Sequence, residues 1–435
     1  MEAFTELSQL ISRFREIGAT RIFYKLLSEN DNSKQQIYLG GSFEALALFP
    51  YGAVTASPEL DEPNFKASLD FFWVAPSGIE QAPGAQLILY PQYPEVRLSG
   101  FLRGSKSAPS RHLRAIPKSQ RTGTDGRALF FGTTPDGRTL AHLALAGSPL
   151  AFEATLAPHV DSGVFKEIPV PGTPAGGSRS LVIARLREIQ EMGAIPSMRL
   201  NKMGERTAYS ARNGGGYTLE ALLGVIPNGD ASPDYLGWEI KAFSGSYITL
   251  MTPEPDGGYY GAEGVGAFVR RYGRKVREKD QLYFTGRHHY EKPQSTTAMT
   301  LSLTGYDAVR QVITDVSGKI VLTASSGEEA ASWTYSNLLT HWNRKHASAA
   351  YVPYKAEAAL APLYRYGNPV LLGERTDFTK YLGALAAGLV VFDPGSKVDN
   401  VSTARPKVKA RSQFRIPKKH LARLYDSFDE LDLSK

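Results

Sequence analysis

Hydrophobic and polar residues follow different patterns in the two parts of the chain. Up to about residue 168, short aromatic and β-branched runs lie between Gly, Pro, Asn and Asp. The runs of strand length are RIFYKLL, QIYLGG, SLDFFWV, AQLILYPQY and EVRLSGFL. This pattern predicts a mainly β domain, a barrel or sandwich with one or two helices. The later run LVIARLREIQEMG has apolar residues at helical spacing, which predicts a helix that Ser180 caps and Gly193 stops.

Between these two parts lies the segment PVPGTPAGGSRS, residues 169–180, in which small and turn-forming residues dominate. Such a composition is typical of a linker. We therefore expect two domains, residues 1–168 and residues 181–435, and a chain of 435 residues is long enough for two cores.

The most informative pattern is YLGWEIKAF, which follows Asp234 and reads as a strand. Glu239 and Lys241 are two residues apart and project from one face, whereas Trp238 and Ile240 project from the other, buried face. Asp234 stands where this strand begins. Two carboxylates and one ammonium suit a divalent metal and an attacking water, which is the chemistry of phosphodiester hydrolysis. The alternative is an exposed ion pair that contributes little.

A third carboxylate lies just upstream, in GGGYTLEALLG. We expect the glycines to form a flexible loop, a hinge at the mouth of the site, because they lack the lysine of a phosphate-binding loop. Thr218 is the expected N-cap of a short helix that carries Glu220. Glu220 could then help to hold a second metal or to steer Lys241.

The order Glu220, Asp234, Glu239, Lys241 resembles the active site of the PD-(D/E)XK nucleases. The longer text LEALLGVIPNGDASPDYLGWEIKAF, followed by ITLMTPEPDGGYYG, resembles the MvaI/BcnI restriction endonucleases and their mismatch-repair relatives of the MutH type. The resemblance runs from about Leu181 to Lys435. It implies an α/β nuclease fold with a central mixed sheet, in which Asp234, Glu239 and the Ile240 carbonyl hold Mg2+.

The same resemblance implies a type II restriction enzyme that cuts double-stranded DNA at CC(A/T)GG and leaves 5′-phosphate and 3′-hydroxyl ends. A monomer that cuts the two strands in turn is compatible with it. A cognate DNA methyltransferase would be a genetic rather than a physical partner.

Two polar clusters in the first part are candidate DNA contacts, since Asn and Gln pair with adenine edges, Arg with guanine, and Lys with phosphates. Their text, ENDNSKQQIYLGGSF and YPEVRLSGFLRG, resembles the B3-like effector domain of EcoRII-type restriction enzymes, which implies a B3-like pseudobarrel. Ordinary surface loops are the alternative. The candidate residues are Lys25, Asn30, Asn32, Lys34, Gln36, Arg97, Arg103 and Lys106.

Two basic stretches in the second part, FVRRYGRKVREKDQLYFTGRHHY and VSTARPKVKARSQFRIPKKHLARLY, are further candidates. Lys407, Lys409 and Arg411 alternate, which predicts one face of a strand directed at nucleic acid. The candidate DNA contacts are Arg287, His288, Lys409, Arg411 and Arg415, of which Arg411 and Arg415 are the expected guanine contacts.

Composition and charge narrow the possible partners and the expected location of the protein. The net charge of +7 and the pI near 9.2 suit an acidic polymer such as DNA as partner. The chain has no cysteine, which excludes disulfides and thiolate chemistry and fits a reducing cytoplasm. The amino-terminal residues lack the apolar core of a signal peptide, and the longest apolar run, YLGALAAGLVVF, is too short to span a bilayer. We therefore expect a cytoplasmic protein without membrane contact.

Other functions remain open at this point. A MutH-like nicking enzyme shares the catalytic order, and a B3-type regulator would bind DNA without cutting it. A glycosidase could use two carboxylates, although Lys241 would then have no role. The sequence contains no HExxH, G-x-S-x-G or GxxxxGK[ST] motif, so a zinc protease, a serine hydrolase and an ATP-driven motor are not supported.

Overall fold

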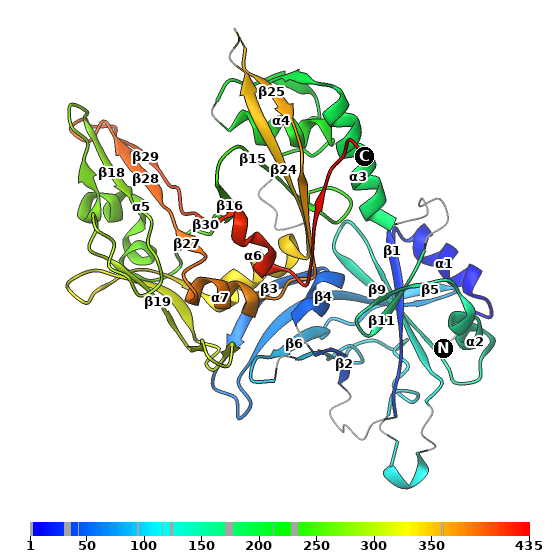
Figure 1. Cartoon of the computed structure of the whole chain (residues 1–435). Helices are drawn as coiled ribbons and strands as arrows, with labels where there is room; N and C mark the ends of the chain where they lie inside the picture. The colour runs from blue at the N-terminus through cyan, green and yellow to red at the C-terminus, as the bar shows by residue number, and fades with distance from the viewer. Residues whose placement is uncertain are drawn as a thin grey trace. The chain divides into compact units, whose positions relative to one another are not determined.

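The structure is a computed structural model. It describes residues 3–29, 36–41, 43–93, 95–114, 116–121, 125–169, 177–211, 213–227, 234–357, 359 and 361–435. Contacts within the chain divide it into two compact units, Met1–Gly177 and Ser178–Lys435 (Figure 1).

The first unit is built on one curled sheet. Its strands are β1 (Arg21–Leu26), β2 (Ile37–Gly40), β3 (Tyr51–Ser57), β4 (Asn64–Ala75), β5 (Gly78–Gln81), β6 (Gln86–Tyr90), β7 (Glu95–Ser99), β8 (Ala128–Thr133), β9 (Arg138–Ala144), β10 (Val160–Ser162) and β11 (Phe165–Ile168). Its helices are α1 (Leu7–Glu16) and α2 (Pro149–Leu156), with the short 3-10 turns η1 (Phe43–Leu48) and η2 (Lys118–Gln120).

The strands of this sheet follow the order β10-β11-β1-β8-β9-β4-β6-β7-β2, and β3 and β5 also pair with β4. The β4–β9 pair is parallel, whereas β1 and β8, for example, run antiparallel. α1 and α2 cover one side of the sheet, where Leu10, Phe14, Tyr24, Phe130 and Ala154 share one core. Each of the five runs that the hydrophobic pattern predicts as strands is a strand here.

The second unit combines helices with several sheets. Its helices are α3 (Gly177–Glu191), α4 (Gly214–Leu222), α5 (Gly258–Tyr272), α6 (Tyr335–His346), α7 (Phe378–Ala386) and the 3-10 segment η3 (Lys418–Leu424). Its strands are β12 (Ala194–Pro196), β13 (Met198–Leu200), β14 (Arg206–Ala208), β15 (Glu239–Phe243), β16 (Tyr247–Met251), β17 (Arg274–Lys275), β18 (Gln281–Thr285), β19 (Thr300–Thr304), β20 (Tyr306–Asp307), β21 (Val312–Ile313), β22 (Lys319–Thr323), β23 (Glu329–Thr334), β24 (Ser348–Glu357), β25 (Leu363–Tyr366), β26 (Val370–Glu374), β27 (Val391–Phe392), β28 (Gly395–Asp399), β29 (Lys407–Lys409), β30 (Phe414–Pro417) and β31 (Ser427–Leu431).

The main sheet of this unit has the order β12-β25-β24-β26-β31, and β15 joins it by parallel pairing with β24. Because β24 runs antiparallel to β25 and β26, the sheet is mixed and the fold is mixed α/β, as the sequence predicts. Val182, Leu186 and Leu219 of α3 and α4 share a core with Trp238 and Ile240, so these helices pack around the strand that bears the predicted site.

Smaller sheets extend from this core. β16, β30 and β27 form one, β17, β18, β28 and β29 form another, and β19, β22 and β23 form a third. β29 lies at one end of its strand order, which leaves it as an edge. The apolar run YLGALAAGLVVF forms most of the helix α7 and, after a short connection, the strand β27.

The first turn of α3 is bonded to the main sheet. Arg179 donates to Glu374 and to Asp429, both at 2.6 Å, and the indole N–H of Trp238 donates to Ser178 Oγ at 3.3 Å. The helix begins at Gly177, so the prediction that Ser180 caps it is wrong. The helix therefore begins within the segment that was predicted as a linker, before Ser180.

Within the described residues, no helix is both long and apolar enough to cross a membrane.

Candidate active site

A two-residue turn brings Asp234 and Glu239 together. Tyr235 and Trp238 exchange backbone hydrogen bonds of 3.0 and 2.8 Å, and the two residues between them, Leu236 and Gly237, have φ angles of 51° and 83°. Two positive φ angles in a two-residue loop are the signature of a type I′ hairpin. The four-residue spacer between the two carboxylates is therefore the length of this turn.

Asp234 is fixed at the start of β15, because its Oδ2 accepts a hydrogen bond of 2.9 Å from the Ile240 backbone N–H. Glu239 and Lys241 lie on one face of the strand, as predicted, and Lys241 Nζ donates to Glu239 Oε1 at 2.7 Å. Glu239 is only 3% exposed, so the alternative of an exposed ion pair does not hold. A buried ion pair of this kind is expensive to desolvate, so its presence points to function more than to stability.

Glu220 approaches the cluster from α4. This helix begins at Gly214, so the predictions of a glycine loop and of Thr218 as N-cap are both wrong. Thr218 is instead buried inside the helix, where its hydroxyl accepts from Met198 N at 3.0 Å. The glycines are needed for close packing: a Cβ on Gly215 would lie 2.4 Å from the Tyr354 ring, and one on Gly214 2.5 Å from Tyr364 Oη.

Burial and mutual repulsion set the protonation of the three carboxyl groups. Burial, followed by the charge of Asp234, raises the pKa of Glu220 to about 7. Burial and then Glu239 raise the pKa of Asp234 to about 6. Burial alone would also raise the pKa of Glu239, but Lys241 and the neighbouring cations hold it below its ordinary value. The cluster therefore holds more negative charge than Lys241 can neutralise.

Two further residues at this site were missed in the sequence. Lys345, near the end of α6, lies close enough to lower the pKa values of Glu220, Asp234 and Glu239. The next residue, His346, is fully buried, and its Nε2 bonds to the Leu250 carbonyl at 3.0 Å. Burial and then Lys241 lower its pKa to about 3, so it is neutral. In the sequence, the sign that could have pointed to Lys345 and His346 is their place shortly before the apolar run SAAYVPY. The two residues reach the site because β24, which contains this run, pairs in parallel with β15.

The residues present suit a divalent cation. Glu239 Oε2 is buried and has no hydrogen-bond partner among the described residues. The raised pKa values of Glu220 and Asp234 mark a site where additional positive charge would be favourable. In the part of the chain that the structure describes, however, no three His, Asp or Glu side chains are already arranged as a complete metal cage. A cation here would keep other ligands, as Mg2+ commonly does.

The candidate DNA contacts of the first unit lie in different surroundings. Asn30, Asn32 and Lys34 lie outside the described residues. Gln36 is buried and accepts a hydrogen bond of 3.1 Å from Arg97, which also pairs with Glu95.

Lys25 is partly buried, with its ammonium 5.8 Å from the centre of the Tyr38 ring. Because Tyr38 is paired with Arg97, the structure brings Lys25, Gln36 and Arg97 into one neighbourhood. Arg103 and Lys106 are exposed on the turn after β7.

Some candidate DNA contacts of the second unit are exposed, whereas others are bonded to neighbouring residues of the protein. Lys409 and Arg411 are both exposed. The strand β29 ends at Lys409, however, so Arg411 lies beyond the strand that was predicted to include it. Arg415 pairs with Asp393 at 2.7 Å and donates to the Tyr247 carbonyl at 3.0 Å. Its guanidinium is partly exposed and already bonded within the protein, so its role as a guanine contact stays a prediction.

Arg287 is half exposed, stacks 4.3 Å from the centre of the Tyr247 ring and lies 3.7 Å from Asp393. His288 is fully buried, with Nε2 2.9 Å from Thr297 Oγ1, and burial lowers its pKa to about 4. The prediction that His288 contacts DNA is therefore wrong. An adjacent pair of histidines in sequence does not reveal which of them points into the core.

Comparison with known proteins identifies the class of the protein. A model of a restriction endonuclease family matches residues 183–425, more than half of the chain and the whole of the site described above. The protein is thus a type II site-specific deoxyribonuclease, a class that generally uses divalent metal ions. The matching model is that of the MvaI/BcnI restriction endonuclease family, and the chain belongs to this family.

Two solved structures of the restriction endonuclease MvaI are similar to part of this chain. The complex of MvaI with its cognate DNA substrate has 18% sequence identity and a TM-score of 0.45, and the match covers 58% of this chain and 97% of MvaI. MvaI in the absence of DNA has 15% identity and a TM-score of 0.31, with coverages of 59% and 98%. No curated protein sequence matches the chain.

Proposed function

We propose that the protein cleaves both strands of double-stranded DNA at CC(A/T)GG, with Mg2+ as cofactor, and leaves 5′-phosphate and 3′-hydroxyl ends. The observation that carries this proposal is the convergence of Asp234, Glu239 and Lys241 at the start of β15. The amino-acid sequence around these residues resembles that of the MvaI/BcnI enzymes, and this resemblance supports CC(A/T)GG as the target. A monomer would suffice, with a cognate methyltransferase as genetic partner.

In this proposal Asp234, Glu239 and the Ile240 carbonyl hold Mg2+, which when bound supplies positive charge beside the scissile phosphate and lowers the pKa of a water. The Lys241 ammonium, which Glu239 holds at 2.7 Å, orients the attacking water and stabilises the negative charge that grows on the phosphate oxygens. Attack of the water on phosphorus breaks the bond to the 3′-oxygen. Glu220 supports the position of Lys241, and Lys345 adds a second cation to the site.

We further propose that residues 1–168 form a B3-like effector domain that binds a second copy of the target, joined by residues 169–180 to the nuclease domain of residues 181–435. The exposed Arg103 and Lys106, and the partly exposed Lys25 and Arg97, support a DNA-binding surface; Gln36 is buried and accepts a hydrogen bond from Arg97. Fluorescence anisotropy with the purified first unit and a labelled CC(A/T)GG duplex tests this part. Equal affinity for a duplex that lacks the site would contradict an effector role.

Cleavage of a plasmid of known sequence, with Mg2+ or with EDTA, tests the catalytic proposal. We expect discrete Mg2+-dependent fragments whose mapped ends lie at CC(A/T)GG, and no fragments from the Lys241→Ala variant. Nicked circles without linear product would favour a nicking enzyme of the MutH type. An intact plasmid to which the protein nevertheless binds would favour a regulator.

A further inference from the structure

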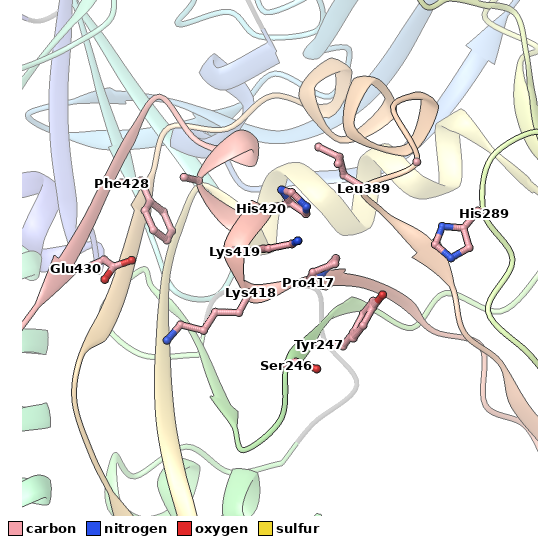
Figure 2. Close-up of a pocket in the computed structure, with 12 residues that line it drawn as sticks. Ser246, Tyr247, His289, Leu389, Pro417, Lys418, Lys419, His420, Phe428 and Glu430 are labelled. Atoms are coloured by element: carbon pink, nitrogen blue, oxygen red, sulfur yellow. The ribbon is translucent and has the colours of Figure 1, made fainter.

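A basic pocket in the second unit is not used by the catalytic chemistry. It has a volume of about 840 Å3 and lies between the start of β16, the segment from Pro417 to Ala422, and β31. Figure 2 shows Phe428 and Glu430 on one side and Tyr247 and His289 on the other. Its polar lining consists of Ser246, Tyr247, His289, Lys418, Lys419, His420 and Glu430.

The register of the main sheet places this pocket on the catalytic face. Glu239 of β15 connects to Phe428 of β31 through one paired residue each of β24 and β26, and Lys241 connects in the same way to Glu430. Directly paired residues face the same side of a sheet. With strands about 4.8 Å apart, the pocket wall on β31 lies about 14 Å from the catalytic pair, on the same face.

The other side of the pocket touches the catalytic strand itself. Phe243 follows Glu239 and Lys241 at intervals of two, so it shares their face. The Lys418 ammonium lies 5.7 Å from the centre of the Phe243 ring, and the Lys418 backbone N–H donates to the Ser246 carbonyl at 2.8 Å. Lys418 therefore lines the pocket and lies beside the catalytic strand.

Positive charge dominates around the pocket. Lys418 and Lys419 face a single acidic lining residue, Glu430. On the other side, the Tyr247 ring is flanked by the guanidinium groups of Arg287 and Arg415, at 4.3 and 5.7 Å from its centre. One carboxylate, that of Asp393, contacts both of these arginines. The pocket thus offers ammonium donors in a basic setting, which suits a phosphate.

We propose that this pocket, which we call the flanking-phosphate pocket, binds a backbone phosphate of the DNA strand that is being cut, within a few nucleotides of the scissile phosphate. The inference rests on the proposed function, because it takes DNA as the substrate. A DNA strand whose scissile phosphate lies at Glu239 and Lys241 reaches the pocket if it continues across this face of the sheet. Lys418 and Lys419 then fix the register of the strand without taking part in the chemistry.

The test measures binding in EDTA, so that cleavage does not interfere. The Lys418→Ala/Lys419→Ala double variant is compared with the wild type and with Lys435→Ala, an exposed lysine that does not line the pocket. We expect the slope of log affinity against log salt concentration to fall by about 1 in the double variant and to stay constant in the control. Thermal unfolding of all three proteins checks that they fold equally well.

Site-specific duplexes sharpen the test. Uncharged methylphosphonates replace, one at a time, the phosphates that flank the scissile position. We expect one position at which the replacement weakens DNA binding by the wild type severalfold but does not change binding by the double variant. This is the result for two groups that contact each other, because removing either one already removes the contact. An unchanged salt slope, or additive losses at every position, would overturn the proposal.

Two outcomes distinguish a failure of the pocket assignment from a failure of the proposed function. If inorganic phosphate at millimolar concentration raises the unfolding temperature of the wild type and not of the double variant, and no methylphosphonate position is coupled, the pocket binds free phosphate and the assignment to DNA is wrong. If the wild-type protein neither binds nor cuts DNA with Mg2+, the proposed function itself fails.

Discussion

Replacing Glu220 by Gln should stabilise the metal-free protein at pH 8 although it slows cleavage. Glu220 is partly buried, and its nearest charged neighbours include Asp234, so its ionised form is disfavoured and its pKa is raised to about 7. Glutamine is neutral at every pH and has almost the same shape as protonated glutamate. The substitution therefore removes the cost of the charge and leaves the packing of α4 in place.

The size of the effect follows from the pKa. A carboxyl with a pKa of 4.5 in the unfolded chain and about 7 in the folded protein favours folding fully below pH 4.5, and this contribution disappears as the pH rises through 7. At pH 8 the ionised group costs up to about 3 kcal/mol of folding free energy. Because Glu220 keeps some contact with water, we expect a gain of about 2 kcal/mol for the glutamine variant at pH 8, and almost none at pH 4.

Denaturant unfolding in EDTA at a series of pH values from 4 to 8 measures this difference. The matched control is Glu263→Gln on α5, an exposed glutamate for which the two stabilities should stay parallel across the series. A Glu220→Gln variant that is equal to, or less stable than, the wild type at pH 8 would refute the electrostatic description of the site. The same variant, assayed with Mg2+, should cut DNA more slowly.

Three further perturbations test other parts of the site. Lys241→Ala should slow cleavage by about 100-fold or more, because it removes the cation that stabilises the transition state, while DNA affinity in EDTA stays nearly constant; joint loss of binding would indicate misfolding. Gly237→Ala should cost about 1 kcal/mol of unfolding free energy, measured by denaturant titration, because alanine is strained at a φ of 83°; an unchanged stability would contradict the turn geometry. Arg411→Ala should weaken discrimination at one base pair by about 1–3 kcal/mol in competition binding, whereas uniform weakening would identify a phosphate contact.

Much of the site could be predicted because its residues are close in sequence. The period of two on β15 places Glu239 beside Lys241, and the length of the spacer places Asp234 across a two-residue turn. The turn itself was not predicted, because Leu236 is not among the residues that usually adopt a positive φ. Burial of Glu239 was also missed, since alternation indicates a face but not what covers it.

Residues that reach the site through tertiary contacts could not be predicted in this way. Lys345 follows Lys241 by more than a hundred positions and approaches because β24 pairs in parallel with β15. For the same reason, the sequence does not show that His288 lies in the core or that the Arg415 guanidinium pairs with Asp393. The glycines of α4 were predicted to form a flexible loop. The structure needs glycine there because tyrosine side chains approach the helix backbone closely.

The first turn of α3 determines where a nuclease module could be exchanged between proteins. Trp238 lies within the hairpin that joins the two catalytic carboxylates, and its indole is bonded to Ser178, while Arg179 ties the same turn to two strands of the main sheet. A junction at residue 181 would discard these bonds and expose the back of the hairpin. Fusions that keep the chain from Gly177 onward would retain them, so the transferable unit begins inside the segment that its composition marks as a linker.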